Sequence, residues 1–396
     1  MNFSLSEEQL LLRDTVNRFL EKNYSFDLRQ KMIRDRQAMS DDIWQGLADL
    51  GLLGVPFSEK DGGFGGGGIE TMIIMRALGY HLAIEPYIST VILAGSIIET
   101  GGAGWQKKAL LPEICKGTTL MAFAHYEEEA GYSLNHVETT AELKGNAWVI
   151  NGKKSMIFHG PVADKLLVSA RTHGKERDEK GVSLFIVDCN DESISGHEYP
   201  LYDGSRALDI KLNGVEVGPE AVVGQIDLAM PLVWMAVDKA TAALCAEAVG
   251  VMERVHEMTL EYLKTREQFG MPIGRFQVLQ HKAVDMFVDL EQATSMAILA
   301  CGSLSRADVI ERRKAVVAAK DFIGRAGRKI GQNAIQIHGG MGMTNEMAIG
   351  HYFKRLEAIE AIFGNSAHQR RIYSELEAGV PVVVDSVPAR KVWRQI

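Results

Sequence analysis

Two segments of this 396-residue chain combine side chains that could hold a phosphorylated cofactor. The first runs from Thr265 to Gln277, where Gly270 and Pro272 should end one helix and Phe276 should precede the next. An arginine, amide side chains and an aromatic ring at such a break can bind a pyrophosphate and flank a flat ring. On the local pattern alone, an ordinary turn between two helices is the better explanation.

The second segment follows another long helical stretch and reads Gln336, Ile337, His338, Gly339, Gly340. Adjacent glycines allow backbone amides to approach a phosphate or an adenine ring closely. The simpler interpretation is a glycine that ends the helix, with His338 as a buried and hydrogen-bonded side chain.

A third pattern, Gly63–Gly68, satisfies the G-x-G-x-x-G signature of dinucleotide-binding folds. Such a fold requires a buried strand directly before the glycines. The preceding residues, Phe57–Asp61, are mostly polar and typical of a turn. We therefore expect a flexible loop here and no nicotinamide site.

Composition excludes several classes of protein. With 43 basic and 51 acidic residues, the net charge is -8, which argues against a nucleic-acid partner. No apolar run reaches the roughly 18 residues that a membrane span needs, and the first residues carry no basic targeting region. The four cysteines are isolated in the sequence, without metal-ligand spacing, so we expect no metal site and a reducing cytoplasm.

The elements that must position these segments follow a helical, β, helical order. We expect a helical domain over residues 1–118, a β domain over 119–227 and a second helical domain over 228–396. Ser6 begins a capping box, and a helix is expected over Asp41–Leu50. In the β domain, Asn151-Gly152 predicts a hairpin turn between two short strands. Thr172–Gly181 is highly charged and is expected to be an exposed connection between strands.

Together these patterns resemble the acyl-CoA dehydrogenase family over nearly the whole chain. The matching motifs are Pro56 with Gly62–Gly65, Asn151–Lys154, Arg266–Ile273, Phe276-Gln277 and Gln336–Gly340. The resemblance implies an N-terminal all-α domain, a middle β-barrel or sandwich domain and a C-terminal four-helix bundle. It also implies an FAD enzyme in which a carboxylate removes the α-proton of an acyl-CoA thioester while a hydride passes to the flavin.

The resemblance assigns FAD contacts to individual residues. Arg266, Gln268, Phe269 and Gln277 would contact FAD. Gln336, Gly339 and Gly340 would contact the adenine and pyrophosphate end of FAD seated in a neighbouring subunit, which requires an oligomer. The resemblance further implies an acyl-CoA substrate and, as a possible electron acceptor, an electron-transfer flavoprotein.

The chain departs from the family at the catalytic base. Phe363 stands where many members carry a glutamate, and Ala240 occupies the position from which other members supply the base. Neither side chain can take a proton. Glu247 lies seven residues after Ala240 on the same helix face and is a weak candidate base. We favour a structural ion pair between Glu247 and a basic residue of another helix.

The residues expected beside the flavin ring also differ. The family's Thr-Glu-Pro-x-x-Gly-Ser-Asp loop is replaced by Tyr126–Ser133, and its Trp-x-Thr segment by Met156–Phe158. This loss resembles the small subunits of heteromeric family members, most closely pimeloyl-CoA dehydrogenase, which act with a homologous large subunit in a heterotetramer. Three alternatives remain open: a flavin monooxygenase on the same fold, a homo-oligomeric dehydrogenase that uses Glu247, and a purely structural subunit.

Overall fold

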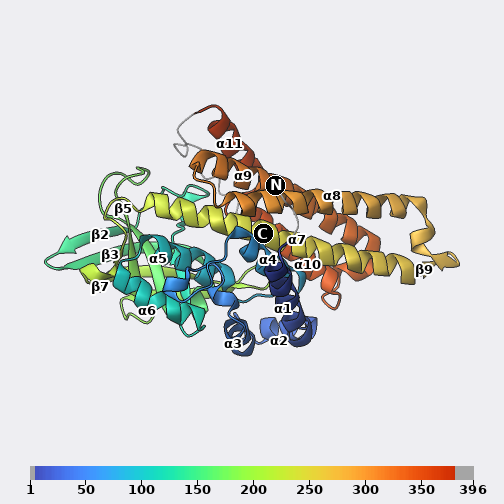
Figure 1. Ribbon diagram of the computed structural model, residues 1–396, viewed down its shortest axis with the longest axis horizontal. Helices are drawn as coiled ribbons and strands as arrows, with labels where there is room; N and C mark the ends of the chain where they lie inside the picture. Colours follow the sequence, from blue (N-terminus) through green and yellow to red (C-terminus); the bar gives the residue numbers. More distant parts are fainter. Residues whose placement is uncertain (1–4, 380–396) are drawn as a thin grey trace. The chain divides into compact units, whose positions relative to one another are not determined.

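The computed structural model describes residues 5–379 (Figure 1). The outer limits of the first and last expected domains, residues 1 and 396, lie outside the described residues. The chain divides into two compact units. The first contains the described residues up to Asp35 together with Gly66–Ile84 and Thr241–Gly379; the second contains Arg36–Gly65 and Glu85–Ala240.

Helices build the first unit. They are α1 (Glu7–Asn23), α2 (Phe26–Arg34), α4 (Gly68–Tyr80), most of α7 (Met230–Thr265), α8 (Gln277–Ser303), α9 (Val309–His338), α10 (Ala348–Ala361) and α11 (Ser366–Glu377). The predicted capping box is confirmed, because Ser6 Oγ accepts the Gln9 amide at 3.2 Å and Gln9 Oε1 accepts the Ser6 amide at 2.9 Å. Within this unit α7 is held by an apolar stripe that includes Leu244, Val251 and Val255, all at most 1% exposed.

The second unit contains shorter helices and the sheet. Its helices are α3 (Asp41–Asp49), a π-helix over Tyr87–Gly95, α5 (Ser96–Gly101) and α6 (Gly104–Cys115). A single 3₁₀ turn, Glu59–Asp61, precedes the glycine run at 63–68, so the dinucleotide-binding arrangement is absent from this described segment. The expected loop is held by backbone hydrogen bonds, because the Phe64 and Gly65 amides donate to Gly54 and Phe57 carbonyls.

Eight strands form one sheet in the order β6-β7-β3-β2-β4-β5-β8, with β1 pairing in parallel to β4. The strands are β1 (Met121–Ala124), β2 (Thr140–Lys144), β3 (Ala147–Phe158), β4 (Lys165–Arg171), β5 (Val182–Asp188), β6 (Ile194–Pro200), β7 (Arg206–Val217) and β8 (Val222–Val223). Alternating side chains, among them Ile150, Val168 and Phe185, fill a core behind the sheet. The predicted helical, β, helical order is therefore confirmed.

The predicted hairpin at Asn151-Gly152 is wrong. Both residues lie inside β3, where the pairing with β7 shifts register between Ile150 and Asn151. A Cβ on Gly152 would lie 2.6 Å from the Thr139 Cα, so the glycine serves close backbone approach at a bulge. The turn that joins β2 to β3 lies upstream, at Gly145 and Asn146.

Two further features bear on the sequence-based expectations. All four cysteines are free thiols. None of the helices in residues 5–379 is long and apolar enough to cross a membrane.

Candidate cofactor site

The segment between α7 and α8 forms a small hairpin at one end of the helical unit (Figure 1). Strands β9 (Glu267–Gln268) and β10 (Met271–Pro272) pair antiparallel, and the Ile273 amide donates to the Arg266 carbonyl at 2.8 Å. The turn residues Phe269 and Gly270 both have positive φ, 54° and 77°. Two-residue hairpin turns need this backbone, but a phenylalanine is strained in it.

Packing within the described residues does not explain why a phenylalanine occupies this strained position. Phe269 is 88% exposed, and its ring meets only the edge of Phe276, with centroids 6.0 Å apart. A strained, solvent-exposed aromatic residue is typical of a binding site rather than of packing. The ring is therefore available to a ligand or to a second protein surface.

The second glycine segment ends α9. Gly339 has φ 59°, a left-handed conformation that favours glycine at a helix end. A Cβ on either Gly339 or Gly340 would meet no atom within 4 Å. Gly340 has no such backbone requirement, so its small size leaves open space beside the backbone. This space fits the close approach of a phosphate or adenine.

A stacked ring pair joins the two segments. The rings of Tyr262 on α7 and His338 on α9 lie with centroids 4.3 Å apart at 27°. His338 Nδ1 lies 2.8 Å from the Ala334 carbonyl, and burial lowers the pKa of His338, so the ring is neutral. Arg266 follows Tyr262 by one helical turn, and Gly339 directly follows His338. The structure therefore brings the two sequence-predicted segments together.

The predicted cofactor residues are open to solvent. All seven are exposed: Arg266, Gln268, Phe269, Gln277, Gln336, Gly339 and Gly340. Within the described chain, the Arg266 guanidinium has no hydrogen-bond or ion-pair partner. The guanidinium of Arg266 and the open space beside the backbone of Gly339 and Gly340 fit the pyrophosphate and adenine of FAD, and the exposed ring of Phe269 lies on the same segment as Arg266.

Neither base position contains an ionisable group. Ala240 is fully buried on α7, and Phe363 is 8% exposed after α10 with φ 57°. The backbone around Phe363 is tightly held, because the buried Lys320 ammonium donates to the carbonyls of Ile359, Glu360 and Gly364 at 2.7, 3.0 and 3.1 Å. The backbone at this position is therefore fixed, but the side chain of Phe363 is a hydrocarbon that cannot accept a proton.

Glu247 forms the ion pair that its burial on an apolar stripe suggested. Arg355 Nε and Nη2 on α10 donate to Glu247 Oε1 and Oε2 at 2.6 and 2.8 Å. Glu247 is 3% exposed. The guanidinium occupies both carboxylate oxygens in a bidentate ion pair, which is the structural role expected for Glu247 and leaves neither oxygen free to accept a substrate proton.

The segment expected beside a flavin ring adopts a strained bulge in β3. Met156 has φ 53°, and its amide donates to Asp209 Oδ1 at 2.8 Å, an atom that also accepts the Tyr199 hydroxyl at 2.7 Å. Met156 is 44% exposed and Phe158 is half-buried. Neither offers a hydroxyl, so this segment lacks a side-chain hydrogen bond for a flavin ring.

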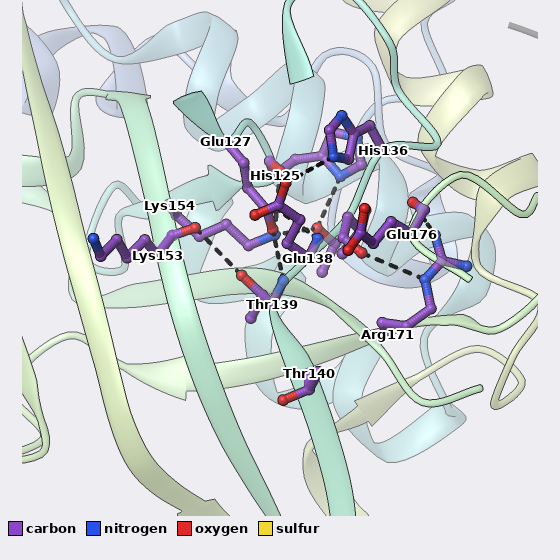
Figure 2. Close-up of polar contacts among 12 residues, drawn as sticks. His125, Glu127, His136, Glu138, Thr139, Thr140, Lys153, Lys154, Arg171 and Glu176 are labelled. Carbon is purple, nitrogen blue, oxygen red and sulfur yellow. Dashed lines mark hydrogen bonds and ion pairs between the residues drawn. The ribbon is translucent and has the colours of Figure 1, made fainter. Parts of the chain in front are cut away.

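A buried ion pair lies behind this segment and was not foreseen from the sequence (Figure 2). The Lys154 ammonium, fully buried, lies 2.7 Å from Glu127 Oε1 and donates to Ser169 Oγ at 3.0 Å. Burial alone would raise the pKa of Glu127, but Lys154 and two backbone amides hold that pKa below its usual range. Lys154 belongs to the Asn-Gly-Lys-Lys motif, and its role is therefore structural.

Three family profiles match consecutive parts of the chain. They describe the acyl-CoA dehydrogenase N-terminal domain over residues 6–118, the middle domain over 122–213 and the C-terminal domain over 232–376. A probable acyl-CoA dehydrogenase of Bacillus subtilis is 28% identical over 378 residues, 94% of this chain and 98% of that protein.

Solved structures give the same result. A chain in the ChsE4-ChsE5 complex from Mycobacterium tuberculosis is 26% identical, with a TM-score of 0.84 over 95% of this chain and 99% of that chain. Butyryl-CoA dehydrogenase from Megasphaera elsdenii is 23% identical, with a TM-score of 0.89 over 96% of this chain and 100% of that chain; at this identity the match concerns the fold.

Proposed function

Because the chain belongs to the acyl-CoA dehydrogenase family, we propose that it is the small, base-lacking subunit of a heteromeric FAD-dependent acyl-CoA dehydrogenase. A homologous large subunit supplies the base and the flavin-ring pocket. This chain supplies the surface for the adenine and pyrophosphate end of FAD. The substrate is a medium-chain, dicarboxylic or ring-bearing acyl-CoA, with pimeloyl-CoA as the nearest example, and an electron-transfer flavoprotein is the candidate acceptor.

The observation that carries the proposal is an asymmetry within one chain. The cofactor segments are exposed, and the Arg266 guanidinium has no partner within the described residues. By contrast, Ala240 and Phe363 cannot act as a base, and Phe158 offers no hydroxyl at the position expected beside the flavin ring. A chain of this kind can complete a cofactor site on another subunit but cannot carry out the reaction itself. The similarity to a chain of a two-component complex from Mycobacterium tuberculosis supports this arrangement.

The residues of this chain would act by binding and orientation. When bound, FAD supplies the hydride acceptor for dehydrogenation between the α- and β-carbons of the thioester. Arg266 would neutralise pyrophosphate charge, the open backbone at Gly339 and Gly340 would receive the phosphate or adenine, and Phe269 would cover an apolar face. No residue at either base position can remove the α-proton, so that step falls to the partner.

Co-expression with the homologous large subunit tests the proposal. The two chains are expected to co-purify with FAD, and the complex should oxidise an acyl-CoA. An isolated chain that retains stoichiometric FAD and full activity would contradict it. Arg275→Ala, which removes another exposed arginine of the segment between α7 and α8, serves as the control for charge effects on assembly.

A flavin monooxygenase on the same fold is the second candidate, because such an enzyme needs no α-proton base and neither base position here is ionisable. The two functions differ in their use of oxygen. Oxygen consumption with reduced flavin, without any need for CoA thioesters, would favour the monooxygenase, whereas anaerobic oxidation of an acyl-CoA by the complex would exclude it.

A further inference from the structure

Two loops at one end of the sheet are fastened to each other by a buried arginine. Arg171, the last residue of β4, is 7% exposed and lies beside the loop before β2 and the charged connection after β4. Its guanidinium donates to five backbone carbonyls: Asn135 at 2.9 Å, Val137 at 3.4 Å, Glu176 at 2.7 Å, Asp178 at 2.9 Å and Lys180 at 2.9 Å. The exposed connection predicted over 172–181 therefore has a defined backbone.

Additional bonds fix the same region. The Val137 amide donates to the Glu176 carbonyl at 2.9 Å, which joins the two loops directly. The amides of Glu138 and Thr139 donate to the Glu127 carboxylate, and Glu127 is anchored by buried Lys154. The backbone positions that carry residues 136, 138 and 176 are thus set by core contacts and not by the side chains of those residues.

Three side chains converge on this frame (Figure 2). His136 Nε2 lies 2.9 Å from Glu138 Oε1. One ligand atom each from His136, Glu138 and Glu176 lies within 4.8 Å of the others. Small rotations of the two exposed glutamates would bring all three atoms into one coordination sphere, while the histidine stays fixed.

The histidine is placed as a ligand would be. His136 is 5% exposed, and within residues 5–379 its Nδ1 is buried without a hydrogen-bond partner. Buried histidines normally have both ring nitrogens bonded, which fixes the tautomer. Here Nε2 donates to the Glu138 carboxylate; a cation would replace that hydrogen bond, because Nδ1, unbonded within residues 5–379, can take the proton while Nε2 offers its lone pair.

The local charges favour a divalent cation. Glu127 is paired with Lys154, and Arg171 interacts with the charges of Asp178, Glu127 and Glu176. Glu138 and Glu176 still place two carboxylates beside one imidazole, with Arg171 offsetting part of their charge. One divalent cation would neutralise both, and it would also remove their mutual repulsion.

We propose that His136, Glu138 and Glu176 bind a divalent transition-metal ion, with Zn²⁺ as the best fit to one imidazole and two carboxylates. Mg²⁺ and Ca²⁺ prefer sites made of oxygen ligands alone and fit this donor set poorly. Because the two glutamates are exposed, solvent completes the coordination, and affinity is in the micromolar range rather than that of a closed structural site. The ion links the loop before β2 to the connection after β4. This proposal is independent of the proposed dehydrogenase role.

Titration of the full, chelator-treated chain with Zn²⁺ alone, followed by calorimetry, tests the site. Wild type is expected to bind one equivalent that is absent from the double variant Glu138→Gln/Glu176→Gln and is not reproduced by Mg²⁺ or Ca²⁺. Both substitutions are at exposed positions, so the fold is preserved, and circular dichroism verifies this. Hydrogen exchange of residues 172–181 should slow on Zn²⁺ addition in wild type only.

Two matched controls separate the site from adventitious binding. Glu179→Gln and His173→Asn alter exposed residues of the same connection that lie outside the cluster. Both variants are expected to bind Zn²⁺ like wild type. Zn²⁺ binding that survives in the double glutamine variant, or that disappears in His173→Asn, would overturn the proposal.

Discussion

The rings of Tyr262 and His338 stack with centroids 4.3 Å apart and so connect the end of α7 to the end of α9. Tyr262 lies one helical turn before Arg266, and His338 lies within the second cofactor segment, directly before Gly339. The stack therefore sets the spacing between Arg266 and the glycine turn at Gly339.

Removal of this stack should weaken FAD binding without unfolding the chain. Aromatic pairs contribute about 0.5–1.5 kcal/mol beyond their buried area, so Tyr262→Ala should weaken FAD binding to the complex by about two- to tenfold. Tyr262→Phe retains the ring and serves as the control. Fluorescence titration of FAD measures the effect, and equal affinity in wild type and Tyr262→Ala would show that the stack does not position the site.

Loss of the proposed phosphate contacts should have a larger effect. A hydrogen bond to a charged group contributes about 1.5–3 kcal/mol, so Arg266→Ala should reduce FAD affinity by about 10- to 100-fold. Gly339→Val combined with Gly340→Val should have a similar effect, because the added side chains fill the open space beside the backbone. Arg275→Ala, in the same segment between α7 and α8, should leave affinity unchanged, and retention of full flavin occupancy in Arg266→Ala would refute the assignment.

Glu247 should contribute to stability and not to the reaction. Glu247→Gln removes the carboxylate of a buried glutamate that Arg355 binds in bidentate fashion, and breaking such a pair typically costs about 3–5 kcal/mol. Urea unfolding should detect this loss of stability. The rate of the complex per bound flavin should stay within a factor of about two of wild type, because loss of a general base would instead lower the rate by about 10²–10⁴-fold. The double variant Glu247→Gln/Arg355→Gln, which also removes the guanidinium charge, should recover part of the stability.

The stability of the β domain should fall in mild acid because of His125. Burial, followed by the charge of Lys154, lowers the pKa of His125 to about 3 from 6.5. The unfolded chain therefore binds a proton between these values that the folded chain does not, so stability is fully present above about pH 6.5 and declines as pH falls toward 3. His125→Gln should reduce the slope of unfolding free energy against pH between pH 6.5 and 5 by up to about 1.4 kcal/mol per pH unit. An unchanged slope would show that His125 is not buried in its neutral form.

The fold was predictable where the signals are local. The Ser6 capping box and the α7 stripe depend on residues within a few positions of one another, and both are confirmed. The Asn151-Gly152 turn was a wrong prediction because a glycine that admits a neighbouring backbone has the same local pattern as a turn glycine. Motif order along the chain was enough to identify the family.

Other features depend on contacts between residues that are distant in the sequence. Glu247 was expected to pair with a basic residue, but Arg355 lies on α10 and could not be identified from spacing. The Tyr262–His338 stack and the Glu127–Lys154 pair likewise join separate elements. The sequence pointed to an FAD surface, and the three-dimensional packing supplied the relation between its two segments.

Anaerobic flavin bleaching by an acyl-CoA is the most direct test of the central claim, that this chain completes an FAD site but lacks the base. The isolated chain supplied with FAD should show negligible bleaching. The complex with the large subunit should bleach, and Glu247→Gln in that complex should bleach at nearly the same rate. Robust bleaching by the isolated chain that Glu247→Gln abolishes would contradict the account and identify Glu247 as the base.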